Sequence, residues 1–257
     1  MKNRIIELAM ACILLIGAVF LPQKAVESSA DVREPQAAQE LETGMTGEVI
    51  LPESNQAQKL PEGEIHKVVL DAGHGGNDPG KIGINGVLEK DINLSIVKML
   101  KEELEAAGIE VVLTRQEDSG LYQETDGNKK QADMKGRCAV IEEANPEVVI
   151  SIHQNSYHQS NVKGPQVFYY TGSEKGKNLA EMLQDSFTEV IGEKNTRSVK
   201  SNSQYYLLLH VKQPIVIVEC GFLSNQEEAD LLKSEEYQRK IAASLRGAVV
   251  SYFLENQ

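Results

Sequence analysis

Three apolar runs of this chain end in a side chain that could bind a metal ion. His74 follows the first run in a glycine-rich turn, His153 closes the second, and Glu219 closes the wholly apolar run 215–218. A fourth candidate, Glu89, lies where a helix is expected to begin. Catalytic zinc commonly takes three ligands from His, Glu or Asp and keeps one position open for water. Two histidines and one glutamate meet that count and leave a second glutamate for proton transfer, so the pattern indicates a zinc hydrolase.

Each candidate also has a purely structural explanation. A lone histidine at a strand end is more often a hydrogen-bonded polar residue than a ligand, and Glu89 alone could be a charge that the dipole favours at a helix N-terminus. Glu219 is harder to explain, because a carboxylate closing a buried aliphatic run is costly unless something pairs with it. Its neighbour Cys220 points to the opposite strand face and is expected in the core. The remaining histidines lack such a context and are expected to be structural: His66, His158 and His210.

The pattern of apolar residues predicts that alternating strands and helices position these side chains. Strands are expected at 66–71, 110–114, 148–152, 166–170 and 215–219. Helices are expected after residue 91, over 134–144, from about residue 173, from a capping box at 224–227, and around 237–249. Strands that are apolar on both faces and alternate with helices indicate an α/β fold, one domain with a twisted, mostly parallel sheet and helices on both faces. Ligands bind such sheets beyond the carboxyl ends of the strands, where three candidates lie.

Composition narrows the possible partners. The 257 residues carry a formal net charge of −12, which argues against nucleic acid, because phosphate binding needs a basic surface. Three scattered cysteines are too few for a disulfide framework or a CxxC metal site. The glycine-rich turn 73–76 matches neither the Walker nor the dinucleotide-binding pattern.

The first 64 residues differ from the rest in composition and in the absence of a strand or helix pattern. Lys2 and Arg4 precede an apolar run over 8–21, which is typical of an export signal. Residues 1–30 are therefore predicted to be a signal peptide or, if uncleaved, an N-terminal anchor that makes the only membrane contact. Residues 31–64 carry eight acids and two bases without periodicity, which predicts a disordered acidic linker before a catalytic domain over 65–257. The protein is expected outside the cytoplasm, secreted or anchored.

Four segments resemble, in order, the signature blocks of the zinc-dependent N-acetylmuramoyl-L-alanine amidases: DAGHGG at 71–76, LEKD at 88–91, SIHQN at 151–155 and VECGFLSN at 218–225. The resemblance extends over roughly residues 67–253. It implies zinc bound by His74, Glu89 and His153, with Glu219 as the catalytic acid and base. It also implies the fold expected above, and peptidoglycan as substrate, cut between the lactyl group of N-acetylmuramic acid and L-alanine of the stem peptide.

Further segments are most similar to the spore-cortex, germination-specific subgroup of this family: Thr114-Arg115, the segment 121–134 and Tyr205-Tyr206-Leu207-Leu208. That resemblance implies a role in building cortex around the forespore, where the stripped muramic acid becomes muramic-δ-lactam. A vegetative amidase for cell separation remains an alternative. A non-catalytic peptidoglycan-binding regulator is disfavoured because all four chemical residues are present, and a zinc carboxypeptidase is a weaker chemical rival. The sequence does not identify an activating partner.

Overall fold

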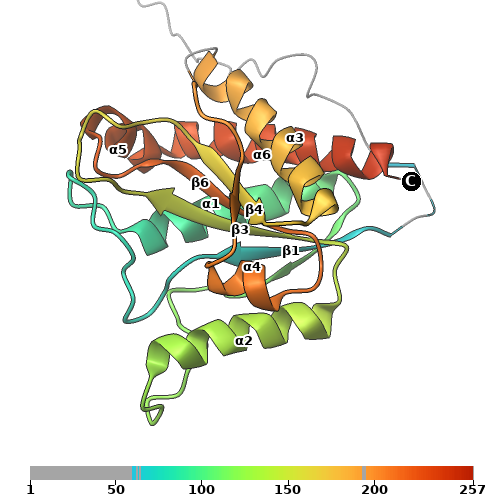
Figure 1. Ribbon diagram of the computed structural model, residues 1–257, viewed down its shortest axis with the longest axis horizontal. Coiled ribbons are helices and arrows are strands. Elements are labelled where there is room, and N and C mark those ends of the chain that lie inside the picture. The colour runs from blue at the N-terminus through green and yellow to red at the C-terminus, as the bar shows by residue number, and fades with distance from the viewer. Residues whose placement is uncertain (1–59, 62, 64, 193–194, 257) are drawn as a thin grey trace, which may run out of the picture. The chain divides into compact units, whose positions relative to one another are not determined.

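Figure 1 shows a computed structural model of the chain, which describes residues 60–61, 63, 65–192 and 195–256. In this described part, one sheet is built from the strands β1 (Lys67–Ala72), β2 (Glu110–Leu113), β3 (Val148–Asn155), β4 (Gln166–Tyr170), β5 (Lys200–Asn202) and β6 (Ile215–Phe222). The helices are α1 (Glu89–Ala106), α2 (Lys129–Ala144), α3 (Glu174–Ile191), α4 (Tyr206–His210), α5 (Gln226–Lys233) and α6 (Glu235–Glu255).

The strand order explains how distant segments meet. The sheet runs β2-β1-β3-β6-β4-β5. Neighbours among β2, β1, β3 and β6 are parallel, and β4 pairs antiparallel with β6 and parallel with β5. The predicted α/β fold with a mostly parallel sheet is confirmed, with β4 and β5 running against the other strands. Because β1, β3 and β6 are adjacent and parallel, their carboxyl ends lie at one edge of the sheet.

Both faces of the sheet are covered, as the doubly apolar strands predict. Val68 and Leu70 of β1 enter the larger core, between the sheet and α1, α3 and α6, whereas Val69 between them enters a smaller core between the sheet and α2 and α4. This alternation follows from the two-residue period of a strand. Figure 1 shows α2 and α4 below the sheet and α3 and α6 above it.

Several boundaries differ from the prediction. Helix α2 begins at Lys129 instead of residue 134, after Asn128, whose side chain accepts from the backbone N–H of Gln131. Helix α5 is capped by Asn225 and not by Ser224. The Ser224 hydroxyl instead accepts from the backbone N–H of Tyr157. Within the described part, the short β5 and α4 were not predicted, because three and five residues are too few to show a period.

The described residues include only a small part of the predicted N-terminal segments. The predicted signal or anchor, 1–30, lies outside them, as does most of the predicted linker, 31–64. Leu60 is buried and belongs to the larger core. The domain boundary at residue 65 therefore stays a prediction, and a shortened chain should start before Leu60 to keep this contact. Among the helices of the described ranges, none combines the length and the apolar character needed to cross a membrane.

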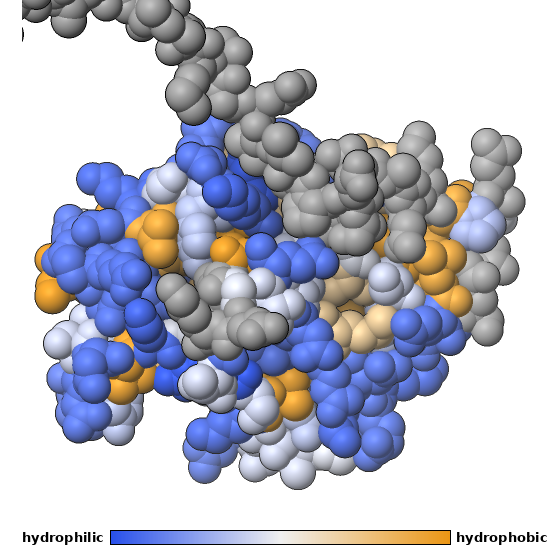
Figure 2. All heavy atoms as spheres, turned by 90° about the horizontal axis from the view of Figure 1, so that it is seen from above, coloured by the Kyte–Doolittle hydropathy of each residue, from blue (hydrophilic) through white to orange (hydrophobic). Residues whose placement is uncertain are grey.

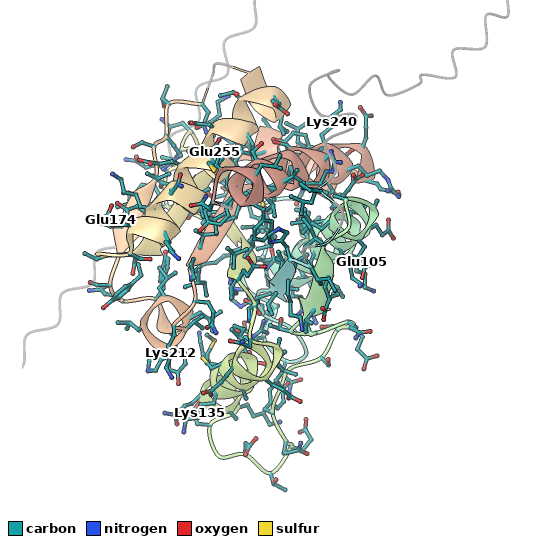
Figure 3. All side chains as sticks on the ribbon, turned by 90° about the vertical axis from the view of Figure 1, so that its right-hand side faces the viewer. Glu105, Lys135, Glu174, Lys212, Lys240 and Glu255 are labelled. Atoms are coloured by element: carbon teal, nitrogen blue, oxygen red, sulfur yellow. The ribbon has the colours of Figure 1, made fainter. Side chains whose placement is uncertain are left out.

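Most of the charge lies outside these cores. The view onto the α3 and α6 side shows a mainly hydrophilic surface with apolar residues in separate patches (Figure 2). Side chains such as Glu105 on α1, Lys135 on α2 and Glu174 on α3 lie at the periphery (Figure 3). Against this background, a few charged side chains are buried near the carboxyl ends of β1, β3 and β6: Asp71, Glu89, Arg115, Arg137 and Glu219.

Candidate active site

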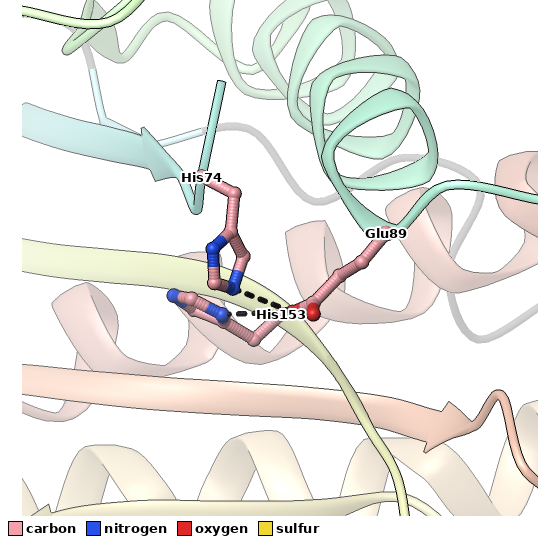
Figure 4. A group of neighbouring side chains, drawn as sticks. All are labelled: His74, Glu89 and His153. Atoms are coloured by element: carbon pink, nitrogen blue, oxygen red, sulfur yellow. Dashed lines mark hydrogen bonds and ion pairs between the residues drawn. The ribbon is translucent and has the colours of Figure 1, made fainter. Parts of the chain in front are cut away.

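The fold brings three of the predicted residues into one group. His74 follows β1, Glu89 is the first residue of α1, and His153 lies near the end of β3. Glu89 Oε1 is 3.2 Å from His74 Nε2 and 3.0 Å from His153 Nδ1 (Figure 4). One potential ligand atom from each residue lies within 4.8 Å of the other two. Two imidazoles and a carboxylate that converge in this way form a donor set suited to zinc.

Local backbone geometry makes room for this group. His74 has φ +62°, in the left-handed region that non-glycine residues rarely adopt. A Cβ at Gly73 would collide with the ring of His153, and a Cβ at Gly80 would collide with Glu89 and His74. Glycine at these two positions therefore lets the imidazoles and the carboxylate approach the backbone closely.

Electrostatics at the group favour a cation. Glu89 is 2% exposed and accepts backbone N–H bonds from Lys81 and Gln154 in addition to its histidine contacts. Burial opposes its ionisation, but the hydrogen bonds from His153 and His74 outweigh burial and hold the pKa of Glu89 below its usual range. The site thus contains a charged, buried carboxylate that faces two imidazoles, and the same field would stabilise a metal ion.

His74 is also held from its other side. Its Nδ1 lies 2.9 Å from a carboxylate oxygen of Asp78. Burial disfavours its protonation, yet contacts with Glu89 and Asp78 raise the pKa of His74 above the ordinary value. A carboxylate on the far nitrogen of a metal-binding histidine typically fixes the ring orientation and strengthens the ligand. This contact therefore leaves Nε2 aimed at Glu89 and His153.

Glu219 lies beside the group but outside it. Its partner in the β3–β6 register is His153. The residue is 9% exposed, and its Oε2 is buried with no hydrogen-bond partner among the described residues. Burial, with a smaller contribution from Glu89, raises the pKa of Glu219 to about 7, although His153 and His74 oppose the shift. A buried, unpaired carboxyl with a pKa near neutrality is suited to taking up and releasing protons.

A cleft of about 300 Å³ opens over these residues between α2 and α4. His74, His153 and Glu219 line it, together with Met134 from α2. On the opposite side it is lined by the start of α4 and the residue before it: Tyr205, Tyr206 and Leu207. The sequence prediction used these three only as marks of a subgroup and missed their place in the cleft, because α4 was not predicted.

Two buried charged residues at the site were also missed. Asp71 ends an apolar strand in the same way as Glu219, so the argument from burial cost would have found it. Arg137 had no such signal, since its position in a polar helix is usually exposed. The histidines predicted to be structural stay outside the metal-type group of the described residues: His66, His158 and His210.

The fold is an α/β scaffold, and its site contains a group of two histidines and a glutamate that could hold a metal ion. Residues 68–251 match the N-acetylmuramoyl-L-alanine amidase family Amidase_3, and the chain belongs to this family. It is therefore an N-acetylmuramoyl-L-alanine amidase that acts on peptidoglycan. Because this substrate lies in the cell wall, the enzyme acts outside the cytoplasm.

Comparison with individual proteins shows which members of the family this chain resembles. The germination-specific N-acetylmuramoyl-L-alanine amidase of Bacillus subtilis is 36% identical over 191 residues, which are 73% of this chain and 80% of that protein. The solved CwlD amidase from Clostridioides difficile, in complex with the GerS lipoprotein, is 38% identical with a TM-score of 0.72 and covers 74% of this chain and 99% of its own. The catalytic domain of CwlV from Paenibacillus polymyxa var. colistinus is 29% identical with a TM-score of 0.64, over 74% and 98% of the two chains. The predicted family and germination-type subgroup are confirmed.

Proposed function

We propose that this amidase depends on zinc held by His74, Glu89 and His153, and that Glu219 transfers the protons of the reaction. The observation that carries the proposal is the convergence of three donor atoms within 4.8 Å, next to a buried carboxyl that lacks a hydrogen-bond partner in the described part of the chain. Two histidines and one glutamate are a ligand set of catalytic zinc sites, and hydrolysis of an amide bond, the reaction of this family, is a reaction that such sites catalyse.

The chemistry divides between the ion and the protein. When bound, zinc would act as a Lewis acid on the scissile carbonyl and make water more acidic. Glu219 takes the proton from the attacking water and passes it to the departing amine of L-alanine. Its raised pKa, about 7, lets one group accept and then donate near neutral pH. The bond cut joins this alanine to the lactyl group of N-acetylmuramic acid, so the products are a free stem peptide and an N-acetylmuramic acid residue whose lactyl carboxyl is free.

We place the action of this enzyme in the spore cortex, on its likeness to the germination-specific amidase and to CwlD. Residues 1–30 would direct export or anchor the chain near the space around the forespore, and 31–64 would link that segment to the catalytic domain. Because CwlD was solved with a lipoprotein, a lipoprotein partner is also proposed here.

Deletion of the gene in its sporulating host tests the cortex role. We expect mutant spores whose cortex lacks muramic-δ-lactam and which do not complete germination, because the amidase would supply the stripped muramic acid. Muropeptide mass spectrometry measures the lactam directly. Complementation with the wild-type gene should restore it, and complementation with the Glu219→Gln gene should not. Normal lactam content in the deletion mutant would instead favour the vegetative alternative.

A further inference from the structure

A buried charge network lies beneath the predicted metal ligands. Asp71 is fully buried, and Arg115 and Arg137 are 3% and 2% exposed. Arg137 extends from α2, in which only Arg137 and Ile141 are buried. An amphipathic helix normally packs through an apolar stripe. Here, one of the two buried side chains is that of Arg137. Its charged guanidinium points toward Asp71 and the turn of His74 instead of toward solvent.

Arg137 holds the turn that carries His74. Its guanidinium donates to the backbone oxygen of His74 at 2.6 Å, to that of Ala72 at 2.8 Å and to Asp71 Oδ1 at 2.6 Å. A fourth bond, from Nε to Asp133 at 2.7 Å, fixes the guanidinium relative to its own helix. The left-handed backbone of His74 is a conformation that persists only when its surroundings enforce it. Arg137 provides that enforcement through the His74 carbonyl.

Arg115 ties the same turn to the helix that carries Glu89. Its guanidinium donates to the backbone oxygens of Ala72 at 2.9 Å and Gly73 at 3.2 Å. It also donates to the backbone oxygen of Lys90 at 2.8 Å, one residue after Glu89. The first turn of α1 and the turn after β1 are therefore fastened to a single side chain.

Asp71 extends the network to the third ligand. Its Oδ2 accepts from the hydroxyl of Ser151 at 2.5 Å, two residues before His153 on β3. Burial disfavours its charge, but Arg137 and the hydroxyls of Ser151 and Thr114 outweigh burial and lower the pKa of Asp71 to about 2. The carboxylate is charged at neutral pH and forms an ion pair with Arg137.

We propose that Asp71, Arg115 and Arg137 act as positioning residues that set the spacing of the three metal ligands before the ion binds. The network holds a group at or close to each ligand: the backbone carbonyl of His74 itself, the backbone carbonyl of Lys90 next to Glu89, and the side-chain hydroxyl of Ser151, two residues before His153. The inference rests on the proposed metal site. Partners that orient metal ligands typically contribute about 10- to 100-fold to metal affinity.

Zinc affinity of the full-length protein, measured by competition with a chromophoric chelator, tests this role. Arg137→Met should bind zinc about 10- to 100-fold more weakly than wild type. Arg137→Lys should recover part of the affinity, because one ammonium group can reach some of the same acceptors but not all of them. If Arg137→Met does not fold, Ser151→Ala removes a single bond to Asp71 and should still weaken zinc binding.

The control is a buried polar residue outside the network. Gln184 on α3 accepts from the backbone N–H of Val167 and donates to the backbone oxygen of Pro165. Gln184→Met should lower the free energy of unfolding of the metal-free protein, measured in urea, without changing zinc affinity. Equal zinc affinity in wild type and Arg137→Met would overturn the positioning role, as would an equal loss in Gln184→Met. Absence of zinc binding by the wild type would overturn the metal site itself.

Discussion

The Glu219→Gln variant should fold, bind zinc as the wild type does, and hydrolyse peptidoglycan about 10²–10⁴ times more slowly, towards the upper end of that range. The amide keeps the shape of the side chain but loses both charge and basicity, and one residue would serve both proton transfers. Since Glu219 Oε2 makes no hydrogen bond in the described part of the chain, the substitution breaks none there. Replacing a buried carboxylate by a neutral group also relieves a desolvation cost.

Steady-state rates together with zinc content per protein check this expectation. Glu228 offers a matched control, because it is another buried glutamate, whose carboxylate accepts from the backbone N–H groups of Gly164 and Phe222. Glu228→Gln should lower stability while turnover per folded molecule stays near the wild-type value. Near-native turnover in Glu219→Gln would move the catalytic base elsewhere, and loss of zinc in that variant would make Glu219 a ligand.

Replacement of His74 or His153 by Ala should remove zinc from the purified protein and abolish activity. Each change deletes one of three converging donors, and the two remaining groups cannot complete the set that zinc commonly takes. Elemental analysis after dialysis measures the metal directly. His158→Ala, a change at an exposed histidine, should keep its zinc. Full zinc occupancy in either ligand variant would exclude that residue from the site.

Much of this site can be predicted from strand ends alone. His74, His153 and Glu219 each follow or close an apolar run, and a parallel sheet brings such positions to one edge. Glu89 was different, because a glutamate at a helix start is usually explained by the dipole, and its role as a ligand came only from the resemblance. In the structure Glu89 contacts both histidines. His153 is 64 positions away in the sequence, so this contact could not be predicted from local spacing.

The features that could not be predicted from the sequence depend on contacts between residues far apart in the chain. The start of α2 was placed five residues late, because the buried face of this helix is made by Arg137 and Ile141 and shows no apolar period. Helix α5 is capped by Asn225 and not by Ser224, because the serine hydroxyl accepts a hydrogen bond from the backbone N–H of Tyr157, 67 positions away. The cleft wall around Tyr205 depends on a five-residue helix with too few turns to be read from periodicity.

The most direct test of the central claim is mass spectrometry of purified peptidoglycan before and after incubation with the enzyme. A zinc amidase of this kind should release free stem peptides that begin with L-alanine and leave glycan strands whose N-acetylmuramic acid carries a free lactyl carboxyl. A chelator should stop the release, and added zinc should restore it. Release of only a C-terminal residue, with L-alanine still joined to muramic acid, would contradict the account, as would cleavage that persists after complete removal of the metal.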